Sequence, residues 1–87
     1  MKVGDRFAEF EMVMKMAVAL ERFIVDEALY DRDGSFLIQI ADTLAYFSMK
    51  EILDQATAEK IDSLDEEEID RRMKDVLGID YDRRILK

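Results

Sequence analysis

The chain contains no proline, and its three glycines, Gly4, Gly34 and Gly78, lie far apart. Proline and glycine are the residues that most often end or interrupt a helix, so two long stretches lack both common breakers. This spacing predicts an all-α single domain with three main helices, over residues 5–30, 35–61 and 63–77, followed by a short tail, 79–87. The first two are expected to form a long antiparallel helical hairpin.

The composition restricts the chemistry that the chain can perform. Its 87 residues suffice for one small domain, and it has no Cys, no His and no Trp. Disulfides, thiol and imidazole catalysis, and His or Cys metal sites are therefore excluded. A glycine-rich phosphate loop is also absent, so we expect no enzyme and no cofactor.

The formal charge is -8 at pH 7, from 21 acidic and 13 basic residues. Nucleic acids and anionic membranes are bound mainly by basic side chains, so this charge predicts no direct nucleic-acid or membrane contact. No apolar run approaches the roughly 18 residues that a membrane span needs. The start of the chain does not resemble a secretory signal, and we expect a cytoplasmic protein.

The first predicted helix starts at Asp5, a favourable N-cap, and carries one narrow polar stripe. Apolar residues cover well over half of its circumference, which is more than one neighbouring helix can cover. The second helix has a similar stripe, which comprises Gln39, Thr43, Tyr46, Lys50, Asp54 and Thr57. A β-hairpin of residues 23–30 and 35–40 is the alternative, although the second segment does not alternate cleanly.

The third predicted helix has the clearest start signal, because Ser63 followed by Glu66 matches a capping box. Several acidic residues precede basic ones by four positions, which favours ion pairs along the helix. Gly78 suits the left-handed residue after a helix, with Ile79 placed to fold back on the last turn.

The lengths of these helices do not match. The first two helices would each be roughly 35 to 40 Å long, and the third helix that packs against them only about 22 Å. Part of the apolar surface of the hairpin would therefore stay uncovered, and such strips usually mark interfaces. We therefore predict self-association, with a homodimer favoured. A break near residues 19–23 or 56–60 would instead give shorter helices that close on themselves. The residues predicted at the interface are Phe10, Met12, Met14, Met16, Leu20, Phe23, Ile24, Phe47 and Met49.

Residues 31–42 resemble a calcium-binding EF-hand loop. Oxygen-bearing side chains occupy loop positions one, three, five, nine and twelve, which are Asp31, Asp33, Ser35, Gln39 and Asp42. Position six is Phe36 where such a loop needs glycine, and Asp42 is shorter than the usual Glu. A simple turn followed by a helix cap explains the same residues.

The densest acidic patch comprises Asp62, Asp65, Glu66, Glu67, Glu68 and Asp70. It could imitate nucleic-acid phosphates in a basic groove of a partner, as small inhibitory proteins of phages and mobile elements do. The alternative is a solvated helix start with internal ion pairs. Glu21 is the one charge inside the apolar arc of the first helix, either paired across an interface or at the edge of the arc with its carboxylate in water.

The leading functional hypothesis is a non-catalytic, acidic protein-interaction module. It would self-associate or bind a larger protein as an inhibitor, adaptor or assembly factor. The calcium-binding helix-loop-helix and the nucleic-acid mimic are the alternatives.

Overall fold

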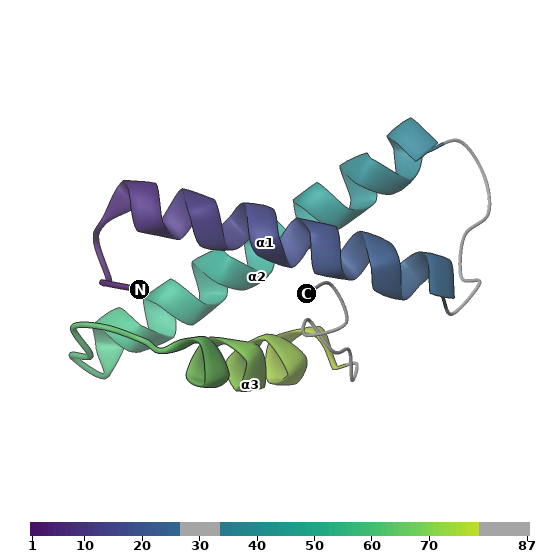
Figure 1. Cartoon of the computed structure of the whole chain (residues 1–87). Helices are drawn as coiled ribbons and strands as arrows, with labels where there is room; N and C mark the ends of the chain where they lie inside the picture. The colour runs from purple at the N-terminus through teal and green to yellow at the C-terminus, as the bar shows by residue number, and fades with distance from the viewer. Residues whose placement is uncertain (27–33, 79–87) are drawn as a thin grey trace.

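The computed structural model describes residues 1–26 and 34–78, which form three helices (Figure 1). These are α1 (Arg6–Asp26), α2 (Gly34–Ala58) and α3 (Glu66–Leu77). The predicted all-α fold of three helices is confirmed. Residues 23–26 and 34–40 are helical, so the alternative hairpin is not formed there, and α1 runs without a break through residues 19–23.

The three helices are arranged around α2. In Figure 1, α1 crosses α2 obliquely, and α3 lies beside the C-terminal half of α2. The apolar residues buried between them include four methionines and several alanines. The core comprises Met12, Met16, Ala17, Ala19, Leu20, Ala41, Ala45, Met49, Ile52, Ala56, Leu64, Ile69 and Met73.

The start of α1 follows from local hydrogen bonding. Asp5 Oδ1 accepts the backbone N–H groups of Phe7 and Ala8 at 3.1 and 3.2 Å, as the sequence predicted for an N-cap. Glu9 accepts the N–H of Gly4 at 2.7 Å. The first four backbone N–H groups of a helix have no carbonyl partner inside the helix. The Asp5 contacts provide acceptors for two of them.

The end of α2 is a Schellman motif. The N–H of Ile61 donates to the carbonyl of Ala56 at 2.9 Å, and the N–H of Lys60 donates to the carbonyl of Thr57 at 3.1 Å. Lys60 has a φ of 59°, the left-handed conformation that glycine adopts most readily. The chain therefore leaves α2 near Ala58, three residues before the predicted end.

The predicted start of α3 is wrong by three residues. The N-cap is Asp65 rather than Ser63, because residues 62–64 pair with the N-terminal residues instead of entering the helix. Lys2 and Ser63 form an antiparallel bridge, and Leu64 N–H donates to the carbonyl of Met1 at 2.8 Å. At the other end Gly78 has a φ of 70°, as predicted, whereas the predicted contact of Ile79 and the tail 79–87 lie outside the described residues.

Candidate functional site

The side of α1 that faces away from α2 carries a row of exposed apolar side chains. We call this row the outer stripe; it comprises Phe7, Phe10, Met14, Val18 and Val25. Phe7 is 77% exposed and Phe10 is 64% exposed. At 3.6 residues per turn the stripe lies opposite the core-facing residues Met12, Met16 and Leu20. Both sides of α1 are therefore apolar, and within residues 1–26 and 34–78 the other helices cover only one of them.

The outer stripe is large for a protein of this size. The exposed fractions correspond to roughly 500 Å² of surface, given the size of aromatic and aliphatic side chains. That value lies in the range of the largest apolar patches on monomeric proteins, which are often functional. Polar side chains border the stripe, among them Glu11 and Lys15, which form an ion pair of 3.6 Å.

The predicted interface residues divide between the core and the surface. Phe10, Met14 and Phe47 are exposed, as an interface requires before its partner binds. Five others are buried in the core of the chain itself, and that part of the prediction is corrected: Met12, Met16, Leu20, Ile24 and Met49. Phe23 is partly buried against the same core. Met49 belongs to the apolar face of α2 itself, and the buried α1 residues lie on the side of α1 toward α2. Periodicity alone could not tell this covered side of α1 from the exposed one.

The methionines of α1 lie on two different sides of the helix. Met12 and Met16 lie in the core, and Met14 lies on the outer stripe. Three further stripe residues, Phe7, Val18 and Val25, were not among the predicted interface residues. Their spacing from Met14 could have predicted them. They lie seven, four and eleven positions from Met14, which places these three residues and Met14 on one side of the helix.

A second group of exposed apolar residues lies on α2. Phe36, Leu44, Tyr46 and Phe47 are exposed, and the rings of Tyr46 and Phe47 meet edge to face with their centres 5.4 Å apart. Phe47 is 61% exposed. The predicted polar stripe of α2 is exposed along its whole length, from Gln39 to Thr57. The surface of α2 therefore mixes polar and apolar groups, unlike the outer stripe.

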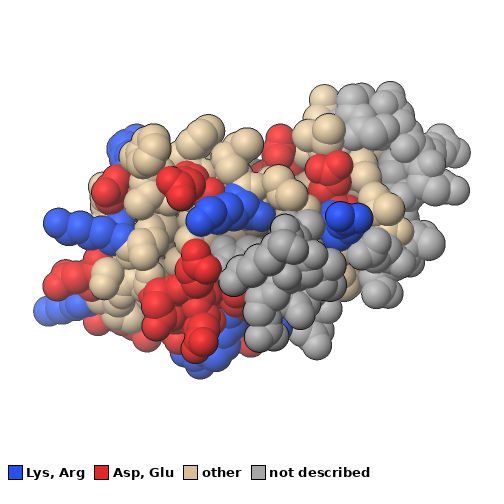
Figure 2. Space-filling view, in the orientation of Figure 1, with Lys and Arg blue, Asp and Glu red and all other residues tan. Residues whose placement is uncertain are grey.

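Part of the acidic patch at the start of α3 is engaged in contacts within the chain. Asp65 caps the helix, Glu66 lies 3.7 Å from the Nζ of Lys15 on α1, and Glu68 binds two arginines. Acidic side chains gather over α3 in Figure 2, with basic ones beside them. These contacts agree with the structural interpretation of the patch, in which the acidic side chains stabilise the helix start.

Arg72 is the centre of an ion-pair network between the end of α2 and α3. Its guanidinium lies 2.8 Å from Glu59 and 2.8 Å from Glu68, and its side chain is mostly shielded from solvent. Glu68 also binds Arg71, and the hydrogen bonds from Arg71 and Arg72 lower the pKa of the Glu68 carboxyl. The hydrogen bonds to Glu59 and Glu68 raise the pKa of Arg72. Of the predicted i,i+4 pairs, Glu68 with Arg72 is formed, whereas Arg71 pairs with Glu68 rather than with Glu67.

The residues of the EF-hand-like segment do not form a loop where the structure describes them. Helix α2 begins at Gly34, so Ser35, Gln39 and Asp42 are helical residues. An EF-hand loop wraps its ligands around the ion and becomes helical only near its end. Asp31 and Asp33 lie outside the described residues. Within the described ranges, no three acidic side chains gather in a way that could hold a metal ion.

Glu21 lies on α1 between the stripe residues Val18 and Val25 and is partly exposed. Its partial exposure agrees with a carboxylate that reaches water, although Glu21 lies within the outer stripe rather than at the edge of the apolar arc. No helix in residues 1–26 and 34–78 combines the length and the apolar character that crossing a bilayer requires. The chain matches no protein-family model, and no curated protein or solved structure is significantly similar to it.

Proposed function

We propose that this protein is a non-catalytic interaction module that self-associates through the outer stripe of α1. The observation that carries the proposal is the exposed row Phe7, Phe10, Met14, Val18 and Val25 on the side of α1 opposite the core. Burial of apolar surface is the main favourable contribution to association. A second copy of the same stripe is the simplest surface of matching length and chemistry, because closed twofold dimers are the commonest oligomers.

The charges of α1 support a second copy over a strongly basic partner. Helix α1 carries four acidic and three basic residues, although the whole chain has a formal charge of -8. Two copies of α1 can therefore approach with little repulsion between their faces. The excess negative charge lies in the rest of the chain, where it would keep other surfaces of the two copies apart.

The dimensions of the stripe support an antiparallel pair of α1 helices. In such a pair centred near residue 16, Phe7 of one copy would lie opposite Val25 of the other, and Met14 opposite Val18. The two stripes together would bury roughly 1,000 Å² of apolar surface, and the flanking polar side chains would add to it. This area is at the lower limit for a specific interface, so we expect a dimer that dissociates at low concentration.

Analytical ultracentrifugation of the full chain tests the proposal. We expect the mass to rise toward twice 10.2 kDa between low and high micromolar concentration. Val18→Glu should weaken the dimer at least tenfold, because it places a charge in the buried strip. The matched control is Thr43→Glu, which adds the same charge at an exposed β-branched residue of α2.

The outcomes separate the possible interfaces. A wild-type chain that stays monomeric at every concentration would contradict the proposal. Equal weakening by Val18→Glu and Thr43→Glu would show that the added charge itself, rather than its position on the outer stripe, weakens association. Thermal unfolding of both variants, followed by circular dichroism, checks that neither change acts by unfolding the monomer.

A further inference from the structure

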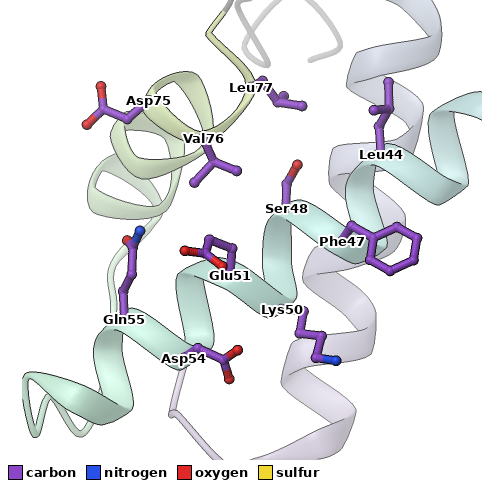
Figure 3. Close-up of a pocket in the computed structure, with 10 residues that line it drawn as sticks. All are labelled: Leu44, Phe47, Ser48, Lys50, Glu51, Asp54, Gln55, Asp75, Val76 and Leu77. Atoms are coloured by element: carbon purple, nitrogen blue, oxygen red, sulfur yellow. The ribbon is translucent and has the colours of Figure 1, made fainter.

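A second surface, distinct from the outer stripe, lies between α2 and the end of α3. It is an open groove of about 870 Å³. Its lining combines apolar, acidic and uncharged polar residues and one lysine (Figure 3): Leu44, Phe47, Ser48, Lys50, Glu51, Asp54, Gln55, Asp75, Val76 and Leu77. Small molecules usually bind in pockets that enclose most of their surface. This groove is open along its side, so it suits an extended or helical peptide better.

The groove exists because α3 is short. Helix α3 ends at Leu77, where Gly78 adopts the left-handed conformation, and α3 covers only the C-terminal half of α2 (Figure 1). Val76 and Leu77 point from α3 toward α2, and Leu77 points toward the small side chain of Ser48. Leu44, one turn before Ser48, is exposed beyond the end of α3. The groove therefore has an apolar end formed by Leu44, Val76 and Leu77.

The acidic residues of the groove differ from those at the start of α3 in their ion pairing within the chain. Glu66 and Glu68 are held in ion pairs within the chain. Among the described residues, Glu51, Asp54 and Asp75 form no such ion pair, and Lys50 is the one basic residue of the lining. Figure 3 shows the Glu51 carboxylate on the side of α2 that faces Val76. The groove thus presents negative charge directly beside apolar surface.

We propose that this groove binds a basic amphipathic peptide segment of a partner protein. Two apolar side chains of the peptide, one helical turn apart, would pack against Leu44, Val76 and Leu77, as in other helix-in-groove complexes. Lysine or arginine side chains of the peptide would reach Glu51, Asp54 and Asp75. The charge complementarity selects a basic segment over an acidic or neutral one and accelerates its association with the acidic chain.

The probe for the test is a fluorescein-labelled helical peptide that places leucines one turn apart and lysines on both flanks. Titration of this peptide with the full chain, followed by fluorescence anisotropy, should give saturable binding that weakens as salt increases. A peptide with the same lysines and with serine in place of leucine should bind at least tenfold more weakly. This comparison separates groove binding from simple attraction to an acidic protein.

Protein variants locate the binding site. Glu51→Gln combined with Asp54→Asn should weaken binding at least tenfold, and Val76→Ser should weaken it several-fold. The matched control is Asp62→Asn combined with Glu67→Gln, which removes the same charge at two exposed residues outside the groove and should change binding less than twofold. Melting temperatures of all variants show whether each one is folded at the assay temperature.

Three outcomes would overturn the proposal. The first is no saturable binding of the leucine-lysine peptide by the wild-type chain. The second is equal weakening by the groove pair and by the control pair, which would indicate nonspecific attraction. The third is binding by an Arg83→Glu, Arg84→Glu variant but not by the wild type, which would assign the groove to basic residues of the chain itself.

Discussion

Asp65 Oδ1 accepts a hydrogen bond from the backbone N–H of Glu68 at 2.7 Å, and this contact fixes the first residue of α3. Substitution of an N-cap aspartate by alanine typically destabilises a protein by about 1 kcal/mol. We therefore expect Asp65→Ala to lower the free energy of unfolding by about 1 kcal/mol. Ser63→Ala should have little effect, since Ser63 lies outside the helix. Urea unfolding of both variants decides between the two capping residues, and a larger effect of Ser63→Ala would contradict the assignment of the cap.

The ion pairs of Glu68 predict a pH dependence of stability. The pKa of Glu68 is lower in the folded chain than in the unfolded chain, because Arg71 and Arg72 bind its ionised form. Its contribution is therefore fully present above the unfolded pKa and is lost as the pH falls through the lower folded value. Glu68→Gln should melt at a lower temperature than wild type at pH 7, and the two should converge in strong acid.

A control for this experiment is Glu67→Gln. Glu67 is exposed, and its side chain takes part in no ion pair with the rest of the described chain. The difference in melting temperature between Glu67→Gln and wild type should be small at every pH. A difference between Glu68→Gln and wild type that persists unchanged in strong acid would show that the glutamate acts by packing rather than by charge.

The left-handed residue after α2 predicts a stabilising substitution. Lys60 adopts a φ of 59°, where a side chain meets steric resistance and glycine does not. Lys60→Gly should raise the free energy of unfolding by about 0.5 to 1 kcal/mol, after subtraction of the greater freedom of glycine in the unfolded chain. Lys60→Ala keeps the steric resistance and should leave stability nearly unchanged. Thermal unfolding compares the two, and equal stabilisation by alanine would attribute the effect to the loss of the lysine charge.

The proposed interface predicts that a substitution at Glu21 changes self-association. It lies between Val18 and Val25 on the outer side of α1, where it interrupts the apolar row. Glu21→Leu should strengthen the dimer by about tenfold, because it extends the buried apolar surface in both copies. Sedimentation equilibrium measures this change. Unchanged or weaker association would indicate that the outer stripe is not the dimer surface.

A substitution at Ala45 tests how tightly the core is packed. Its side chain is fully buried within the core cluster. Ala45→Leu should lower the free energy of unfolding by about 1 to 3 kcal/mol, since adding atoms to a well-packed core forces neighbouring side chains and backbone to shift. Ala58→Leu, at an exposed position near the end of α2, should have little effect. Chemical unfolding that gave equal stability for both variants would indicate a loosely packed core.

Much of the fold could be predicted because its signals are local. The absence of proline, the cap at Asp5 and the apolar row through Ile69 and Met73 each act within a few residues of the chain. Gly78 likewise adopts the predicted left-handed conformation for a steric reason that needs no neighbour. The error at Ser63 has the opposite cause, because pairing with Lys2, distant in the sequence, keeps that residue out of the helix.

The candidate interface could be predicted only in part for a related reason. The sequence by itself determined that α1 is apolar on more than one side, since the spacing of its residues fixes their directions around the helix axis. Only the tertiary structure decided that α2 covers Met12 and Met16 and leaves Phe7 and Val18 exposed. Helical periodicity defines the faces of a helix, whereas the choice of the buried face depends on the shape and packing of a neighbour distant in the chain.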